Sequence, residues 1–202
     1  MNPPTSAMRR LTEAAGSRFA DLSYDEVSLS DIANDLGIRK ASIYSHVGSK
    51  QALFLAVLDE AFQVETAFAQ QCFDSEEASS LPGMHYCETL PNRYTQSMYM
   101  RFLLRNAYVP PKSLSARVSI SYEDYQQQLL RAFVSRLRQR SSGALTEPDL
   151  SQFGDAYLGI IDSLHVELIY AGVGRFGGRL HALQRLLFAG LERAENVREE
   201  MK

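Results

Sequence analysis

The stretch that decides the fold is Ser28–Phe54, SLSDIANDLGIRKASIYSHVGSKQALF. Ser28 is a good N-terminal cap, and Asp31 follows three residues later, where a carboxylate favours the exposed amides of a helix start. Gly37 is suited to end this short helix, because glycine accepts the positive φ of a turn without steric cost. A second short helix is predicted from about Arg39 to Val47.

Two short helices form a helix-turn-helix when their contact and their turn meet specific conditions. The residue of the first helix that faces the second must be small, and Ala33 fits; the turn needs a positive φ, and Gly37 fits. Apolar side chains must fill the wedge between the helices, and five are available: Ile32, Leu36, Ile38, Ile43 and Val47. A plain helical hairpin would satisfy the apolar positions alone, so the combination predicts a helix-turn-helix.

The distribution of charge supports a nucleic-acid surface on this motif. The whole chain carries 21 Lys and Arg against 24 Asp and Glu, a net charge of −3, so nucleic-acid affinity must come from a local patch. Residues 39–50 contain three cations (Arg39, Lys40 and Lys50) and no carboxylate, although the first 50 residues are balanced. Because phosphate contact is chiefly electrostatic, we expect this segment to face DNA.

The rest of the chain shows apolar residues at helical spacing, which predicts an all-α fold. An acidic, Ser-rich loop is expected at 74–83, and a helix at 84–108 has Pro91 as a candidate interruption. Further helices are predicted at 113–140, from the Thr146 cap to about residue 170, and after a glycine-rich hinge at 172–178. We expect a three-helix head at 1–50, joined by a long fourth helix to a larger helical body within 51–202.

Composition excludes several classes of protein. Hydrophobic residues make up 45% of the chain, which favours a folded core. Two cysteines are too few for a disulfide framework, and four scattered histidines do not favour a metal site. No cofactor is expected. No apolar run suggests a signal peptide or a membrane span, so a cytoplasmic location is expected.

The same stretch resembles the N-terminal domain of TetR-type (TetR/AcrR) transcriptional repressors. The matching positions are Ser28, Asp31-Ile32-Ala33, Gly37-Ile38, Ile43-Tyr44-Ser45-His46-Val47, Ser49-Lys50 and Leu53-Phe54. Val47 stands where the family usually has Phe, so we expect a wedge of smaller volume. The match covers about a quarter of the chain. It implies a DNA-binding head, a variable ligand-binding body and a homodimer formed through the last two helices.

The resemblance also implies roles for individual residues. Ser28, Tyr44 and Lys50 would hold the DNA backbone, and the residues facing the major groove would be Arg39, Lys40, Ser42, Ser45 and His46. Arg39 and Lys40 are the best direct readers, because long cations reach guanine acceptors, although either could contact only phosphate. His46 could equally be a solvated side chain.

The body contains candidates for a small-molecule site. Polar aromatic and polarisable groups would suit an aromatic or otherwise apolar effector, and Arg105 could meet a carboxylate on such a ligand. The candidate set is Tyr86, Tyr94, Met98, Phe102, Arg105, Tyr122, Tyr125, Asp162 and His165. For any one of them, an ordinary place in the core or on a solvated face is the competing interpretation.

The last two predicted helices carry apolar stripes that could form an intermolecular four-helix bundle. The candidate interface residues are Tyr157, Ile161, Leu180, Leu183, Leu187 and Leu191. Burial within the monomer is the alternative. A dimer is also expected on functional grounds, because two heads can bind the two halves of a palindromic DNA site.

Three functions remain open from the sequence. The first is a ligand-responsive repressor that binds palindromic operator DNA as a dimer. The second is a small helical ligand-binding protein or enzyme with a vestigial head; no catalytic motif is evident, so we do not expect an enzyme. The third is a redox sensor that uses Cys72 and Cys87, which flank the predicted loop at 74–83.

Overall fold

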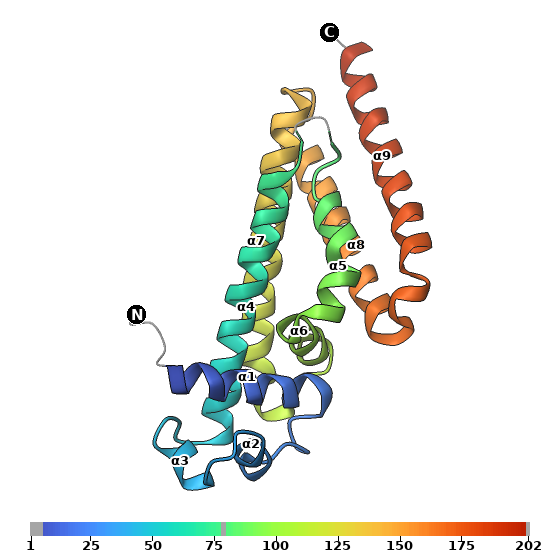
Figure 1. The fold of residues 1–202 in the computed structure, drawn as a ribbon. Coiled ribbons are helices and arrows are strands. Elements are labelled where there is room, and N and C mark those ends of the chain that lie inside the picture. The colour runs from blue at the N-terminus through green and yellow to red at the C-terminus, as the bar shows by residue number, and fades with distance from the viewer. Residues whose placement is uncertain (1–5, 78–79, 201–202) are drawn as a thin grey trace. The chain divides into compact units, whose positions relative to one another are not determined.

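The computed structural model describes residues 6–77 and 80–200, and this part of the chain is helical without strands (Figure 1). The prediction of an all-α fold is confirmed. The α-helices are α1 Ser6–Asp21, α2 Leu29–Asp35, α3 Lys40–Tyr44, α4 Lys50–Ser75, α5 Met84–Gln96, α6 Met98–Tyr108, α7 Ser115–Ser141, α8 Glu147–Ala171 and α9 Phe176–Glu200. Two short 3-10 turns, η1 Lys112–Leu114 and η2 Gly172–Gly174, precede α7 and α9.

The chain divides into two compact units. The first unit combines the chain up to Glu65 with Thr95–Tyr122, and the second combines Thr66–Tyr94 with the chain from Glu123 onward. Helices α4, α5 and α7 therefore each contribute residues to both units.

The core of the first unit is aromatic. Phe19 of α1, Phe54 of α4 and Phe102 of α6 are all fully buried. The Phe54 ring centroid lies 5.2 Å from those of both Phe19 and Phe102. Gly16 allows α1 to approach α6 closely, because a Cβ at this position would lie 2.5 Å from the Met98 sulfur. This packing joins α1, α4 and α6 in one core.

The core of the second unit is built around Tyr157 of α8. Its ring stacks on that of Phe133 from α7, with 4.3 Å between centroids, and its hydroxyl donates to the Gly83 carbonyl at 3.1 Å. Gly83 has a φ of +76°, and a Cβ there would lie 2.5 Å from the Tyr157 ring. One side chain thus joins α8, α7 and the segment that leads into α5.

The predicted helix at 84–108 is broken at Ser97, not at Pro91. Pro91 lies inside α5, although a proline in a helix removes one backbone donor and its ring crowds the carbonyl four residues earlier. Ser97 has an extended backbone, and its hydroxyl accepts from the Met100 amide at 3.2 Å, which caps α6. The expected glycine-rich hinge is also shorter than predicted, because α9 begins at Phe176.

Helix α8 belongs to a stretch, Glu147–Gly174, that is long and apolar enough to cross a membrane by length and composition alone. In the second unit its apolar side supplies buried side chains, among them Tyr157, Ile161 and Leu164. We therefore interpret α8 as a core helix of a folded domain.

Candidate functional site

The first helix of the helix-turn-helix begins at a capping box. The Asp31 amide donates to the Ser28 hydroxyl oxygen at 3.2 Å, and the Ser28 hydroxyl and amide donate to the Asp31 carboxylate at 2.6 and 3.2 Å. The hydrogen bonds that Asp31 accepts hold its pKa below the ordinary value, and the bond from the Ser28 hydroxyl has the largest effect. The cap predicted from the sequence is confirmed, and it defines the start of α2.

The turn between α2 and α3 depends on Gly37. Its φ is +63°, as predicted, and its amide donates to the Asn34 carbonyl at 3.1 Å. The next amide, that of Ile38, donates to the Ala33 carbonyl at 3.0 Å. This pair of bonds is a Schellman motif, which satisfies the last carbonyls of α2 and redirects the chain into α3.

Replacing Gly37 by Ala should lower the free energy of unfolding by about 1 kcal/mol, because an L residue is strained at this φ. No atom lies within 4 Å of the added Cβ, so the cost comes from the backbone alone. Gly48→Ala is the matched control, since Gly48 has equally open surroundings and is not among the glycines with positive φ. Urea denaturation measures both variants, and equal losses would contradict the assignment.

The wedge between α2 and α3 is apolar, with one correction. Ile32, Ile43 and Val47 are buried, so Val47 fills the position where Phe was the expected residue. Leu36 is half-buried. Ile38 was expected in the wedge, but it is 39% exposed, because it follows the left-handed turn at the outer edge of the motif.

The outward side of α3 and its flanks carries most of the predicted DNA contacts. Ile43 and Val47 point into the wedge, and the neighbouring side chains are therefore turned to solvent. Six predicted residues are exposed: Arg39, Lys40, Ser42, Tyr44, Ser45 and His46. Ser28 is half-buried. This exposure makes the surface available to a large ligand.

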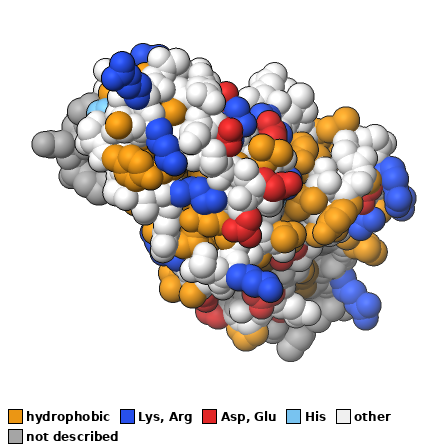
Figure 2. Space-filling view, turned by 90° about the horizontal axis from the view of Figure 1, so that it is seen from below, with side chains coloured by type: hydrophobic (Ala, Val, Ile, Leu, Met, Phe, Trp, Pro, Cys, Tyr) orange, Lys and Arg blue, Asp and Glu red, His pale blue; other side chains and the backbone are white. Residues whose placement is uncertain are grey.

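Charge on this surface is positive because Arg39 and Lys40 are exposed and residues 39–50 contain no carboxylate. Asp35 of α2 accepts two hydrogen bonds from the Arg18 guanidinium, at 2.6 and 2.7 Å, and these bonds hold the pKa of Asp35 below its ordinary value. Within the described part of the chain, Arg39 and Lys40 form no ion pair. Figure 2 shows Lys and Arg side chains among uncharged ones on the left of this face, with Asp and Glu gathered nearer its middle.

Lys50 is placed differently from the exposed residues. It is half-buried at the start of α4, and its ammonium donates to the carbonyls of Tyr24 at 2.7 Å and Val27 at 2.9 Å. The ammonium also lies 4.3 Å from the centre of the Tyr24 ring. Sequence reasoning missed these contacts, because no local pattern links a lysine to carbonyls more than 20 residues earlier.

Four predicted effector residues lie in the first unit: Met98, Phe102, Arg105 and Tyr122. Phe102 belongs to the aromatic core, and Met98 packs against it. Arg105 is exposed, and the Tyr122 hydroxyl lies 3.1 Å from that of Tyr108. Packing in the core explains the positions of Phe102 and Met98 without a bound ligand.

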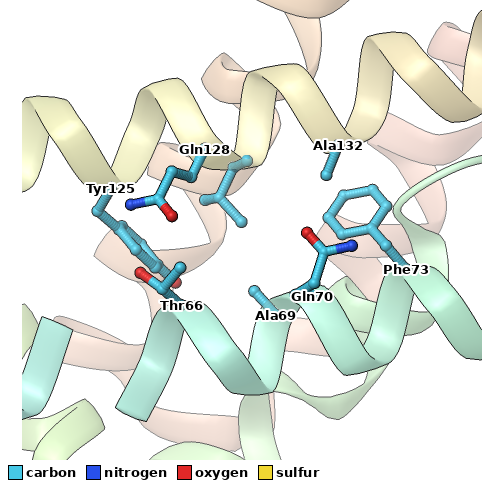
Figure 3. Close-up of a pocket in the computed structure, with 8 residues that line it drawn as sticks. Thr66, Ala69, Gln70, Phe73, Tyr125, Gln128 and Ala132 are labelled. Carbon is cyan, nitrogen blue, oxygen red and sulfur yellow. The ribbon is translucent and has the colours of Figure 1, made fainter. Parts of the chain in front are cut away.

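The other five lie in the second unit: Tyr86, Tyr94, Tyr125, Asp162 and His165. The structure brings Tyr86 and Tyr125 together, both buried, through a hydrogen bond between their hydroxyls. Tyr125 also lines a small cavity between α4 and α7, where side chains of the two helices face each other (Figure 3). Its volume of about 10 Å³ suits a single water molecule. Asp162 accepts a hydrogen bond from the Gln126 amide at 3.3 Å.

His165 is fully buried in α8, and burial lowers its pKa from 6.5 to about 3. The unfolded chain therefore binds a proton below pH 6.5 that the folded chain does not bind until about pH 3. Stability should fall as the pH drops below 6.5, by about 1.4 kcal/mol at pH 5.5 from this group. Thermal unfolding of His165→Leu should lack this component, whereas the exposed His181→Leu should behave like the wild type.

Most of the predicted interface residues are buried inside the protomer. Tyr157, Ile161 and Leu191 are at most 1% exposed, Leu180 and Leu187 are also buried, and Leu183 is half-buried. The stripe on α9 meets α8 of the same chain, which was the alternative interpretation. Other apolar side chains of these helices face solvent: Val166 at 40%, Tyr170 at 76%, Leu186 at 72% and Phe188 at 41% exposed.

Burial argues against the redox interpretation of the two cysteines. Both thiols are free and buried, and burial raises the pKa of Cys87 to about 12 and that of Cys72 above its ordinary value. The thiolate is the reactive form, so neither group is activated. In the described ranges, no cluster of three or more His, Cys, Asp or Glu could hold a metal ion.

Comparison with known proteins places this geometry in a wider context. Residues 11–57 match the family model described as "Bacterial regulatory proteins, tetR family". This match spans α2, α3 and parts of the flanking helices. No curated protein matches the chain.

Solved structures of transcriptional regulators share the fold. A TetR-family regulator from Agrobacterium tumefaciens has a TM-score of 0.69 at 18% identity, over 91% of this chain and 98% of that chain. A TetR-like regulator from Rhodococcus sp. RHA1 has a TM-score of 0.68 at 17% identity, over 95% and 99%. A regulator from Saccharomonospora viridis in complex with choline has a TM-score of 0.65 at 17% identity, over 94% and 97%. At these identities the likeness concerns the fold.

Proposed function

The chain belongs to the TetR-type family of transcriptional regulators, and from this premise we propose that it is a ligand-responsive repressor that binds palindromic operator DNA as a dimer. The observation that carries the proposal is the surface of α3. Arg39 and Lys40 are exposed there, and the described part of the chain pairs neither with a carboxylate. A cytoplasmic location follows from this role.

In the proposed complex, α3 lies in the major groove. Arg39 and Lys40 would reach guanine acceptors, and Ser42, Ser45 and His46 would line the same groove. Tyr44, at 51% exposure, would contact a phosphate with its hydroxyl, and Ser28 would do so from the start of α2. A five-residue helix offers few contacts, so a second copy is needed for a selective complex.

For the dimer, we propose the solvent-facing sides of α8 and α9. Exposed Val166 and Tyr170 lie one turn apart on α8, and Leu186 of α9 is 72% exposed. Small exposed residues flank them, including Gly159 and Ala182, which would allow close approach of two helices. Two copies would then bury this apolar surface in an isologous four-helix bundle.

The effector would bind inside the second unit as a small apolar or aromatic molecule. The Tyr86–Tyr125 pair and the cavity beside Tyr125 provide aromatic surface with hydroxyl groups. The choline complex of the Saccharomonospora viridis protein supports small-molecule binding by this fold. Because the cavity is far smaller than a ligand, the effector must favour an expanded arrangement, and this differential binding would change the affinity for DNA.

Fluorescence anisotropy with the DNA that flanks the gene for this protein tests the proposal. Titrations at several salt concentrations, with and without competitor DNA, should show tight, salt-dependent and sequence-selective binding. If no selective binding occurs there, selection of bound fragments from genomic DNA tests for a distant operator. Failure of both would contradict a DNA-binding function.

A further inference from the structure

A surface groove lies between the second half of α7 and the first turns of α8, and none of the predicted site residues lines it. Its volume is about 520 Å³, whereas the cavity beside Tyr125 measures about 10 Å³. Binding sites for small molecules commonly have volumes of about 300–1,000 Å³. The groove lies within residues 130–151 and therefore entirely within the second unit. It is large enough for a small organic molecule without any expansion of the core.

The floor of the groove is apolar. Leu130 and Val134 of α7 are half-buried, and Leu150 of α8 is buried and lines the same groove. The two helices approach closely at Gly154, where a Cβ would lie 2.5 Å from Leu130 and 3.1 Å from Val134. About one turn earlier on α8, the short side chain of Ser151 leaves the floor open. An apolar chain on this floor would remove apolar surface from water, which stabilises a complex.

Two arginines of α7 line the groove, and they differ in their partners. Arg138 forms a bidentate ion pair with Glu147 of α8, with nitrogen–oxygen distances of 2.6 and 3.0 Å, at one end of the groove. Arg131 is exposed, and it forms no ion pair with any residue that the structure describes. A guanidinium presents its N–H donors in a fork that matches the two oxygens of a carboxylate. The groove thus combines an apolar floor with one available cation.

From these features we propose that the groove binds an amphipathic monocarboxylate, whose carboxylate pairs with Arg131 and whose apolar part lies on the floor. One carboxylate is enough, because Glu147 already neutralises Arg138. The two arginines are two turns apart, about 11 Å along α7, which suits an apolar chain of medium length. The site is separate from the cavity beside Tyr125, which lies between α7 and α4. It goes beyond the proposed function and does not depend on DNA binding.

Three probes with the same apolar chain and different head groups test the proposal: octanoate, octanol and octylamine. Isothermal titration calorimetry at neutral pH should show the tightest binding for octanoate and no binding of octylamine over the same concentrations. Arg131→Gln should weaken octanoate binding by roughly tenfold or more, because a charge-assisted pair is lost, and should leave octanol binding unchanged. The matched control is Arg185→Gln, since Arg185 is exposed on α9 and does not line the groove.

A second variant fills the groove without changing its charge. Ser151→Phe places a ring over the apolar floor, and Ser151 is exposed, so the substitution disturbs little of the core. This variant should weaken the binding of both octanoate and octanol. Ser119→Phe is its matched control, because Ser119 is exposed on α7 outside the groove and should have no effect. Circular dichroism and cooperative melting establish that each variant is folded before its affinity is compared.

Three results would overturn the inference. Equal octanoate binding by the wild type and by folded Arg131→Gln would exclude the proposed ion pair. Unchanged binding by Ser151→Phe would place octanoate in another site, such as the core. No octanoate binding by the wild type at millimolar concentration would show that the groove takes no such ligand. None of these measurements uses DNA, so failure of the inference is distinguishable from failure of the proposed function.

Discussion

Replacing Leu186 by Glu should convert the protein to monomers and reduce operator affinity by at least about a hundredfold, because the second head then no longer binds at high effective concentration. Leu186 is 72% exposed on α9, so the substitution disturbs little within one protomer. In the proposed dimer it would place two carboxylates in a buried apolar interface without partners. Sedimentation velocity measures the assembly, and anisotropy measures the affinity.

The controls for this prediction come from other apolar side chains. Ile120 is 55% exposed on α7, in the first unit, so Ile120→Glu should remain dimeric and bind operator DNA normally. Leu187, next to Leu186, is buried within the protomer, so Leu187→Glu should lower the melting temperature instead of simply separating the subunits. If Leu186→Glu stays dimeric at nanomolar concentration, the interface lies elsewhere.

Replacing Arg39 or Lys40 by Ala should relax the sequence preference of binding. A side chain that reads a guanine contributes about 1–3 kcal/mol of discrimination, so affinity for the cognate operator should fall by roughly tenfold to a hundredfold. Affinity for unrelated DNA should fall much less. Competition titrations against operators altered at one base pair at a time identify the position that each residue reads.

For Arg39 and for Lys40, either result assigns the side chain to a base or to the DNA backbone. Arg9→Ala is the matched control, because Arg9 is exposed on α1, outside the helix-turn-helix, and its loss should not change which operator is preferred. A uniform loss of affinity across all operator variants for Arg39→Ala would assign that residue to the DNA backbone. The same result for both Arg39 and Lys40 would remove direct base reading by the start of α3.

The sequence alone predicted the helix-turn-helix well, because local interactions determine it. The capping box joins Ser28 to a residue three positions away, and the turn depends on the conformational freedom of Gly37 itself. The helical period determines which side chains of α3 point inward. The predicted DNA-facing side chains lie on the other side and are exposed to solvent. Features like these need no knowledge of distant contacts.

Prediction from the sequence was less accurate where one local pattern is compatible with two different structures. Pro91 and Ser97 both permit a helix break, and packing and capping placed it at Ser97. The leucine stripe of α9 identified an apolar face but could not name the helix that covers it. The structure covers Leu187 and Leu191 within the protomer and leaves Leu186 exposed, which moves the proposed interface to another face.

What the sequence by itself determined is therefore the all-α class, the helix-turn-helix and the face of α3 that carries its cations. Only the tertiary structure decided which distant groups meet: Lys50 with carbonyls 23 and 26 residues earlier, and Tyr86 with Tyr125, 39 residues apart. The physical reason is that propensity, capping and periodicity act over a few residues, whereas burial and hydrogen-bond pairing depend on how whole helices pack.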